Sequence, residues 1–308
     1  MSDLTTPLIL HVDANQTLCL GNSSFLSHRN HGEQKYRYSI QFEIRKLIAS
    51  QIFGVIRNQN QFIETRGHGK TTSYLDYLQT KPFAQQRSLC MQVLTRFGHL
   101  LKVRKLYLNI RRKLGIPASS FFEAIQTRHL ETTIPFFLPS AVQLLKKLPL
   151  LAQTRPVVFF IRSFGRFSQE CANAFKDITN TPLHQLEPHE VQTVALKSVN
   201  QLIPSLECYF VQEDWTGETS KKFFPVIPRC LNWFFDDHWT FDPYLIFPSH
   251  FIPLQFDEHF PQDSGVVKTD LLQAVLNENY YVQLLACSAC SAFSTFKRTK
   301  TPIHDPKV

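Results

Sequence analysis

The sequence predicts an α/β fold in which a parallel sheet carries helices on both faces and a mainly helical module is inserted after the first strand. Short apolar segments of strand length alternate with segments of helical periodicity, a pattern typical of parallel sheets that are covered on both faces. Polar residues directly follow the predicted strands. The helical stretch between the first two strands is too long for an ordinary crossover, which indicates an inserted module.

The predicted core consists of residues 1–30 and 150–308. Short, mostly apolar segments predict buried strands at residues 7–12, 157–161, 206–211 and 231–235. Helical periodicity predicts helices at residues 168–175 and 191–203 and, over most of their length, at residues 267–285. This alternation of strands and helices favours one doubly covered sheet.

Residues 31–149 form the predicted helical module. Apolar residues recur at helical spacing, as in Ile40, Ile44 and Ile48, although the polar segment 54–72 is ambiguous. Gly115 is expected to end one helix, because glycine commonly follows the last helical turn. Pro139 is expected in the first turn of another helix, where a missing N–H costs nothing.

The composition indicates a globular protein with anionic partners. Hydrophobic residues make up 43% and charged residues 19% of the 308 residues, a balance that argues against intrinsic disorder. The 33 Lys and Arg residues exceed the 25 Asp and Glu residues, so the formal charge is +8, which favours phosphorylated or otherwise acidic partners. Seven scattered cysteines fit unpaired thiols in a reducing compartment better than a disulfide framework.

The sequence also predicts where the protein acts. The N-terminal segment lacks the features of a signal peptide, and no apolar stretch is long enough for a membrane span, so we expect a cytoplasmic protein. Whether it acts in its own cell or is delivered into another stays open, as does its oligomeric state. The basic segment 102–113 is best interpreted as a solvated helix face. Its alternative role is to steer an acidic partner, whereas no nucleic-acid-binding motif is present.

Polar side chains gather at the predicted strand ends. Because the carboxyl ends of parallel strands meet at one edge of a sheet, the residues there should lie close together. They are Asp13 and Asn15, Arg162 and Ser163, residues 212–214, and Asp236 with Asp237. Three of these four ends bring carboxylates to the edge. In a chain with a basic excess, a bound cation is the simplest explanation for that cluster.

The same residues resemble the ordered motifs of the haloacid dehalogenase (HAD) superfamily. HVDANQT is similar to the first motif, Asp-x-Asp-x-Thr, and Ser163 in FFIRSFG to the second, a Ser or Thr at the end of the next core strand. Lys221 or Lys222 fits the third motif, with Lys222 preferred because it lies nearer the next strand. Asp236 and Asp237 in WFFDDHW resemble the fourth motif, an acidic pair.

The resemblance covers nearly the whole chain and is closest to a poorly characterised group with Asn at the second motif position. It implies a Rossmannoid three-layer core with an inserted cap. In this interpretation Asp13 attacks a phosphoryl group and forms an aspartyl-phosphate. Mg²⁺ would be held by Asp13, the main-chain carbonyl of Asn15, and Asp236 or Asp237. Ser163 and the Lys would contact the phosphoryl oxygens.

Asn15 departs from the motif, in which the second Asp transfers protons to the leaving group and from water. An amide cannot do this at neutral pH, and general acid–base catalysis is typically worth about 10²–10⁴ in rate. A phenol, with a pKa of about 10, is a better leaving group than an alcohol. We therefore expect a phosphatase of small molecules or phosphoproteins that favours aryl phosphates such as phosphotyrosine. The alternative is a catalytically silent phosphate-sensing or protein-binding module; a weaker one is a basic surface that binds nucleic acid or acidic lipid.

Overall fold

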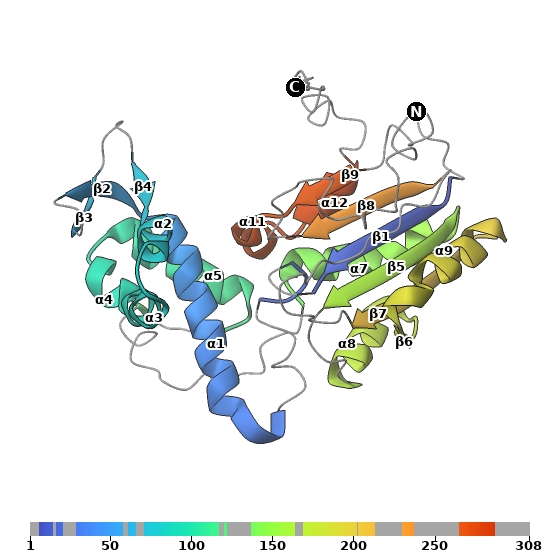
Figure 1. The fold of residues 1–308 in the computed structure, drawn as a ribbon, viewed down its shortest axis with the longest axis horizontal. Coiled ribbons are helices and arrows are strands. Elements are labelled where there is room, and N and C mark those ends of the chain that lie inside the picture. Colours follow the sequence, from blue (N-terminus) through green and yellow to red (C-terminus); the bar gives the residue numbers. More distant parts are fainter. Residues whose placement is uncertain are drawn as a thin grey trace, which may run out of the picture.

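The computed structural model describes residues 6–14, 17–20, 29–57, 61–65, 71–116, 120–121, 137–163, 169–201, 203–212, 230–236 and 265–286. Within these ranges the chain forms a six-stranded sheet and a separate three-stranded sheet. Figure 1 shows two lobes, one built around each sheet. The fold is therefore α/β, with a parallel main sheet and a segment inserted between its first two strands in chain order.

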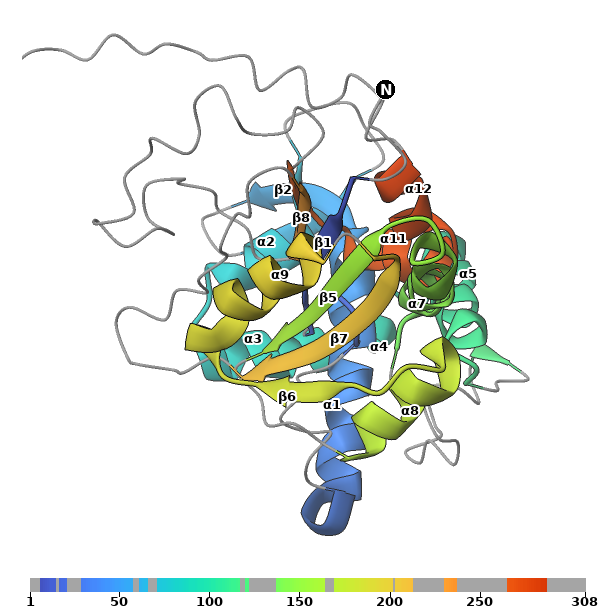
Figure 2. The same ribbon diagram turned by 90° about the vertical axis from the view of Figure 1, so that its right-hand side faces the viewer.

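The main sheet has the order β6-β7-β5-β1-β8-β9, and each neighbouring pair is parallel (Figure 2). Its strands are β1 (Leu8–Asp13), β5 (Pro156–Ser163), β6 (His184–Leu186), β7 (Ser205–Gln212), β8 (Leu231–Asp236) and β9 (Gly265–Lys268). β1 and β5 are buried along their whole length, which explains why most of their residues are apolar on both faces. The four predicted strands are thus confirmed, and two short ones were not predicted.

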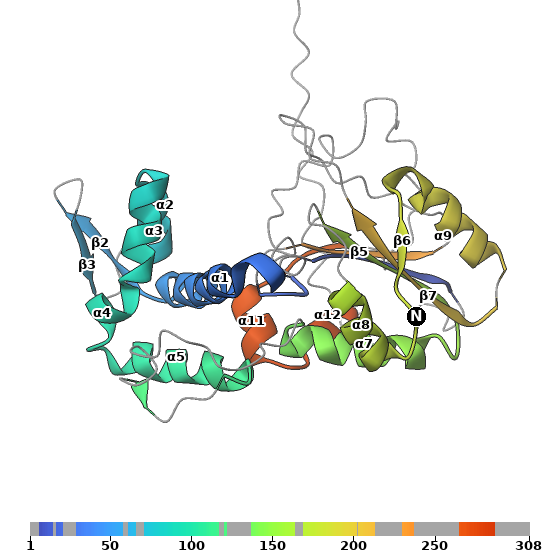
Figure 3. The ribbon, with the colours of Figure 1, turned by 90° about the horizontal axis from the view of Figure 1, so that it is seen from below.

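Helices cover both faces of this sheet, giving three layers (Figure 3). One face packs against α9 (Val191–Asn200), which follows the 3₁₀ turn Pro188–Glu190, through Ile9, Val158 and Phe160. The larger apolar cluster lies on the other face and includes Leu10, Phe159 and Phe235. The helices over that face are α7 (Pro139–Leu151), α8 (Gln169–Thr179), α11 (Leu271–Leu276) and α12 (Tyr280–Ala286).

The inserted lobe is mostly helical but contains a small antiparallel sheet of order β3-β2-β4. Its elements are α1 (Arg29–Ser50), β2 (Phe53–Arg57), β3 (Gln61–Glu64), β4 (Thr72–Ser73), α2 (Tyr74–Gln79), α3 (Phe83–Met91), α4 (Val93–Phe97) and α5 (Leu101–Lys113). The structure thus shows the mainly helical character expected here, and the three strands lie in or at the edges of the segment 54–72 that the sequence left ambiguous. The strands give a weak signal because they are short and partly exposed, so their side chains do not alternate cleanly.

The small sheet closes over an aromatic core. Phe62 of β3 packs edge-on against Tyr74 and Phe97, with ring centroids 5.0 and 6.2 Å away. Arg96 donates to the main-chain carbonyl of Phe62 at 3.1 Å, and its guanidinium lies over the Tyr74 ring. Gly54 is required in β2, because a side chain there would collide with the Ile63 carbonyl and the Phe62 ring.

The starts of β9 and α7 can be compared with the sequence predictions. Residues 265–268 form β9, although we expected helix from residue 267; β9 pairs only with β8 among the described strands, and four residues are too few to show a period. α7 begins at Pro139 as predicted, and it packs beside α8 and α12 over the main sheet. The predicted boundary at residue 149 thus falls at the end of a helix that contacts the core, and the division into domains stays a prediction.

Candidate active site at the carboxyl edge of the main sheet

β1 lies in the middle of the main sheet, between β5 and β8. In chain order the longer strands run β1, β5, β7 on one side, and the chain then crosses to β8 and β9 on the other. The strand order therefore reverses next to β1, and in open α/β sheets ligands bind outside the carboxyl ends of the strands at such a point. Asp13 is the last residue of β1. In Figure 1 the arrowheads of β1, β5 and β8 point toward the inserted lobe.

Asp13 is 3% exposed and is followed by a tightly turned loop. The main-chain N–H of Leu18 donates to the Asp13 carbonyl at 3.3 Å, and that of Cys19 donates to the Ala14 carbonyl at 2.9 Å. The Ala14 N–H continues the pairing with β5 by donating to the Arg162 carbonyl at 2.9 Å. Asp13 is thus the first residue of a loop whose two ends are joined by main-chain hydrogen bonds.

β5 brings two predicted edge residues beside Asp13. Arg162 is its direct partner in the β1–β5 register, and both residues therefore occupy the same face of the sheet. Ser163 is the last residue of β5, and by strand alternation it belongs to the opposite face. Both Arg162 and Ser163 are fully buried. The residue next to Asp13 across this strand pair is therefore Arg162, to which the sequence interpretation gave no catalytic or binding role.

β8 contributes Asp236 from the other side of β1. Val12 pairs with Phe235, and the next residue on each strand is Asp13 and Asp236, respectively. The backbone of Asp236 also pairs with Lys268 of β9. The last residues of three neighbouring strands, Asp13, Ser163 and Asp236, thus meet at one edge, as expected for a parallel sheet.

The remaining predicted site residues are not among those that the structure describes. They are Asn15 in the loop after β1, the lysine pair Lys221 and Lys222, and Asp237 after β8. Within the described ranges, no three His, Cys, Asp or Glu side chains gather as a metal-binding group. The predicted donors are all carboxylate or carbonyl oxygens, which is the donor chemistry that Mg²⁺ prefers. Asp13 and the backbone position of Asp236 fit this set.

A row of stacked rings supports the Asp13 face of the sheet. His11 lies between Phe160 of β5 and Phe234 of β8, with centroids 4.8 and 5.0 Å away and nearly parallel planes. Phe160 in turn stacks on Tyr209 of β7 at 5.6 Å. The guanidinium of Arg162 lies 3.4 Å from His11 Nδ1, which accepts because arginine can only donate. Burial and the neighbouring Arg162 charge hold the pKa of His11 well below its usual value.

The sequence interpretation missed the pairing of His11 with Arg162. A signal was present, since both are polar residues inside strongly apolar strands. Histidine two residues before Asp13 must share its face in a strand. Their contact depends on the β1–β5 register, which joins residues 151 positions apart and which the sequence alone does not supply.

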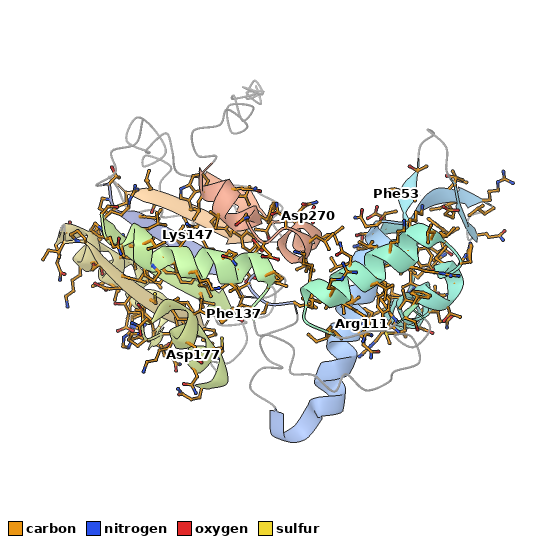
Figure 4. All side chains as sticks on the ribbon, turned by 180° about the vertical axis from the view of Figure 1, so that it is seen from behind. Phe53, Arg111, Phe137, Lys147, Asp177 and Asp270 are labelled. Atoms are coloured by element: carbon orange, nitrogen blue, oxygen red, sulfur yellow. The ribbon has the colours of Figure 1, made fainter. Side chains whose placement is uncertain are left out.

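The loop after Asp13 is tied to the C-terminal part of the described chain. The hydroxyl of Tyr281 donates to the main-chain carbonyl of Thr17 at 2.5 Å. Thr17 Oγ1 also lies 3.3 Å from Thr269 Oγ1, which is 252 positions further along the chain. Figure 4 labels Asp270, the residue after Thr269, between the main sheet and the inserted lobe.

The basic helix α5 uses most of its cations in intramolecular contacts. Lys102 pairs with Glu64 at 3.1 Å, and Lys113 pairs with Glu278, just before α12, at 2.7 Å. Arg104 donates to the Gly98 carbonyl, and buried Arg111 donates to the Tyr107 hydroxyl at 3.1 Å. These contacts favour a structural role for the helix over steering of a partner.

Comparison with known proteins found no match: neither a family model, nor a curated protein, nor a solved structure matches this chain. None of the helices in the described part of the chain is both long and apolar enough to cross a bilayer.

Proposed function

We propose that the protein is a Mg²⁺-dependent, HAD-like phosphohydrolase that acts through an aspartyl-phosphate at Asp13. The observation that supports this most is the position of Asp13. It is a buried carboxylate at the end of the central strand, at the reversal of strand order, with the ends of β5 and β8 on either side. In open α/β sheets ligands bind outside the carboxyl ends of the strands at such a reversal, so a carboxylate there is well placed for phosphoryl transfer.

In the proposed reaction a carboxylate oxygen of Asp13 attacks phosphorus, and the bond from phosphorus to the leaving oxygen breaks. The leaving oxygen takes its proton from solvent. A water molecule then attacks the phosphorus of the aspartyl-phosphate, which releases inorganic phosphate and restores Asp13. Asp13, the Asn15 carbonyl and Asp236 or Asp237 would hold Mg²⁺. When bound, the ion would reduce the repulsion between the Asp13 carboxylate and the phosphate dianion.

The neighbouring residues have distinct roles in this proposal. Ser163 and Lys222, or Lys221, contact the phosphoryl oxygens. Arg162 places a buried positive charge on the same face of the sheet as Asp13, where it can interact with the negative charge of a bound phosphoryl group. Asn15 provides hydrogen bonds without proton transfer, so the preferred substrates are aryl phosphates, with phosphotyrosine as the natural example.

The test is a metal-supplemented phosphate-release assay on three substrates: para-nitrophenyl phosphate, a phosphotyrosine peptide and an alkyl phosphate of similar size. We expect Mg²⁺-dependent release from the aryl substrates, slower release from the alkyl phosphate, and loss of at least about 10³-fold in Asp13→Asn, because the nucleophile is gone. Equal rates on aryl and alkyl substrates would remove the aryl preference. Activity retained in Asp13→Asn would refute the mechanism.

Asn15 favours a second candidate, a silent HAD-like module that binds phosphorylated partners without cleaving them. The discriminating variant is Asn15→Asp, which restores a group able to transfer protons. In the enzyme interpretation this variant raises an existing rate, most strongly for the alkyl phosphate. In the silent-module interpretation the wild type releases no phosphate on any substrate, and only the variant is active.

A further inference from the structure

Tyr281 contacts three separate parts of the fold around the proposed site. Its side chain is fully buried at the start of α12. The hydroxyl donates to the Thr17 carbonyl in the loop after Asp13, and the ring packs edge-on against Phe235 at 5.8 Å and 71°. Its main-chain N–H donates to Ser140 Oγ of α7 at 2.9 Å. Phe235 directly precedes Asp236, so Tyr281 connects the two segments that carry the proposed metal ligands.

Thr269 provides a second connection between the same two regions. It follows β9, whose last residue, Lys268, pairs with Asp236. Its hydroxyl meets that of Thr17 at 3.3 Å, and all of Thr17, Thr269 and Tyr281 are buried. Both connections therefore join the Asp13 loop to the β8–β9 side of the sheet, in a region that excludes water as a competing partner.

We propose that Tyr281 is a positioning residue for the Mg²⁺ site, holding the Asp13 loop at a fixed separation from the end of β8. This inference rests on the proposed function. Mg²⁺ requires a nearly ideal octahedron with ligands at about 2.0–2.1 Å, so a small shift between two ligand-bearing segments weakens its binding. Groups that orient metal ligands typically contribute about 10–100-fold to metal affinity or activity.

The neighbouring tyrosine offers a matched control. The hydroxyl of Tyr280 accepts a hydrogen bond from the main-chain N–H of Asp270 at 3.0 Å, and its ring centroid is 5.3 Å from that of Tyr281. Tyr280→Phe therefore removes one hydroxyl and one hydrogen bond from the same helix without touching Thr17. Tyr281→Phe keeps the ring that packs against Phe235 and removes the hydroxyl that donates to the loop.

The experiment measures Mg²⁺ binding to the full-length protein by isothermal titration calorimetry, with MgCl₂ as the only ligand. We expect Tyr281→Phe to weaken Mg²⁺ binding by about 10–100-fold and Tyr280→Phe to leave it within about 2-fold of wild type. In the phosphate-release assay, Tyr281→Phe should need more Mg²⁺ for half-maximal rate, while KM for para-nitrophenyl phosphate at saturating Mg²⁺ stays unchanged. Thr269→Val, which removes the other connection, should act in the same direction.

The outcomes separate this inference from the proposed function. If wild type binds Mg²⁺ and Asp13→Asn does not, the proposed Mg²⁺ site at Asp13 exists. Unchanged affinity in Tyr281→Phe, or equal losses in Tyr281→Phe and Tyr280→Phe, then overturns the positioning role alone. If wild type shows no Mg²⁺ binding that depends on Asp13, the metal site and its positioning residue both fail. Should Tyr281→Phe prove unfolded by circular dichroism, Thr269→Val decides, and unchanged affinity in it overturns the inference.

Discussion

Arg162 is the largest fully buried side chain in the described part of the chain, and it lies where a buried carboxylate needs a countercharge. It is the strand partner of Asp13 and contacts the ring of His11. Charges removed from water are tolerated in a protein interior when they are paired or hydrogen-bonded. At this scale the site places one buried arginine beside one buried aspartate in register and in hydrogen-bond contact with one histidine.

Replacement of Arg162 by Met should therefore destabilise the fold, because it leaves the Asp13 carboxylate buried without its neighbouring cation. Loss of one partner of a buried pair typically costs about 3–5 kcal/mol. The free energy of unfolding in urea at pH 7 measures this cost. Asp13→Asn introduced into Arg162→Met should recover part of it, since the uncompensated charge is then absent. Strictly additive costs would show that the two side chains do not interact.

At the level of elements, the end of α5 has a well-defined termination. The N–H of Ile116 donates to the Arg111 carbonyl at 2.8 Å and that of Gly115 to the Arg112 carbonyl at 3.1 Å, which is the Schellman pattern. Gly115 has φ +68°, in the left-handed region, and no other described atom lies within 4 Å of the position its Cβ would take. The requirement for glycine is therefore conformational and not steric crowding.

Gly115→Ala should destabilise the protein by about 1 kcal/mol, the usual cost of the left-handed conformation for a residue with a Cβ. Gly115→Asn should cost less, because asparagine adopts this conformation more readily. Thermal or urea unfolding of the three proteins gives the order. An alanine variant as stable as wild type would mean that the helix end rearranges without loss.

Elements with a local signal could be predicted from the sequence, and elements that depend on tertiary pairing could not. Gly115 and Pro139 act within one turn of their own helices, and the long buried strands β1 and β5 are mostly apolar. β6 and β9 have three and four residues, respectively, and exist through their pairing with β7 and β8. For the same reason Asp13, Ser163 and Asp236 were found as strand ends, whereas the contacts of Arg162 and Tyr281 were not.

At the scale of the whole molecule, buried thiols connect stability to pH. Five of the seven cysteines are described, and all five are buried, in line with the expected reduced thiols. Burial raises the pKa of Cys90, Cys171 and Cys230 from 9.0 to about 12. They are distributed over the inserted lobe, α8 and the start of β8, so their ionisation affects both lobes.

Alkaline pH should therefore weaken the fold. Below pH 9 the thiols are protonated in both states, and their contribution to stability is fully present. Between pH 9 and about 12 the unfolded chain loses these protons while the folded chain keeps them, so the free energy of unfolding falls as pH rises. Unfolding temperatures from pH 7.5 to 11 measure this, and Cys171→Ala should reduce the slope. At pH 8 these buried cysteine thiols should resist alkylation by iodoacetamide until the protein is unfolded.

The central place of β1 has a consequence for biosynthesis. Its neighbour β8 begins at Leu231, about 220 residues further along the chain, which a ribosome adding about 5–20 residues per second reaches roughly 10–45 s later. Throughout that interval the apolar segment Leu8–Asp13 has been made but lacks the strand that completes its pairing. We therefore expect the nascent protein to need chaperone protection of its earliest apolar segment more than a chain whose sheet grows from one side.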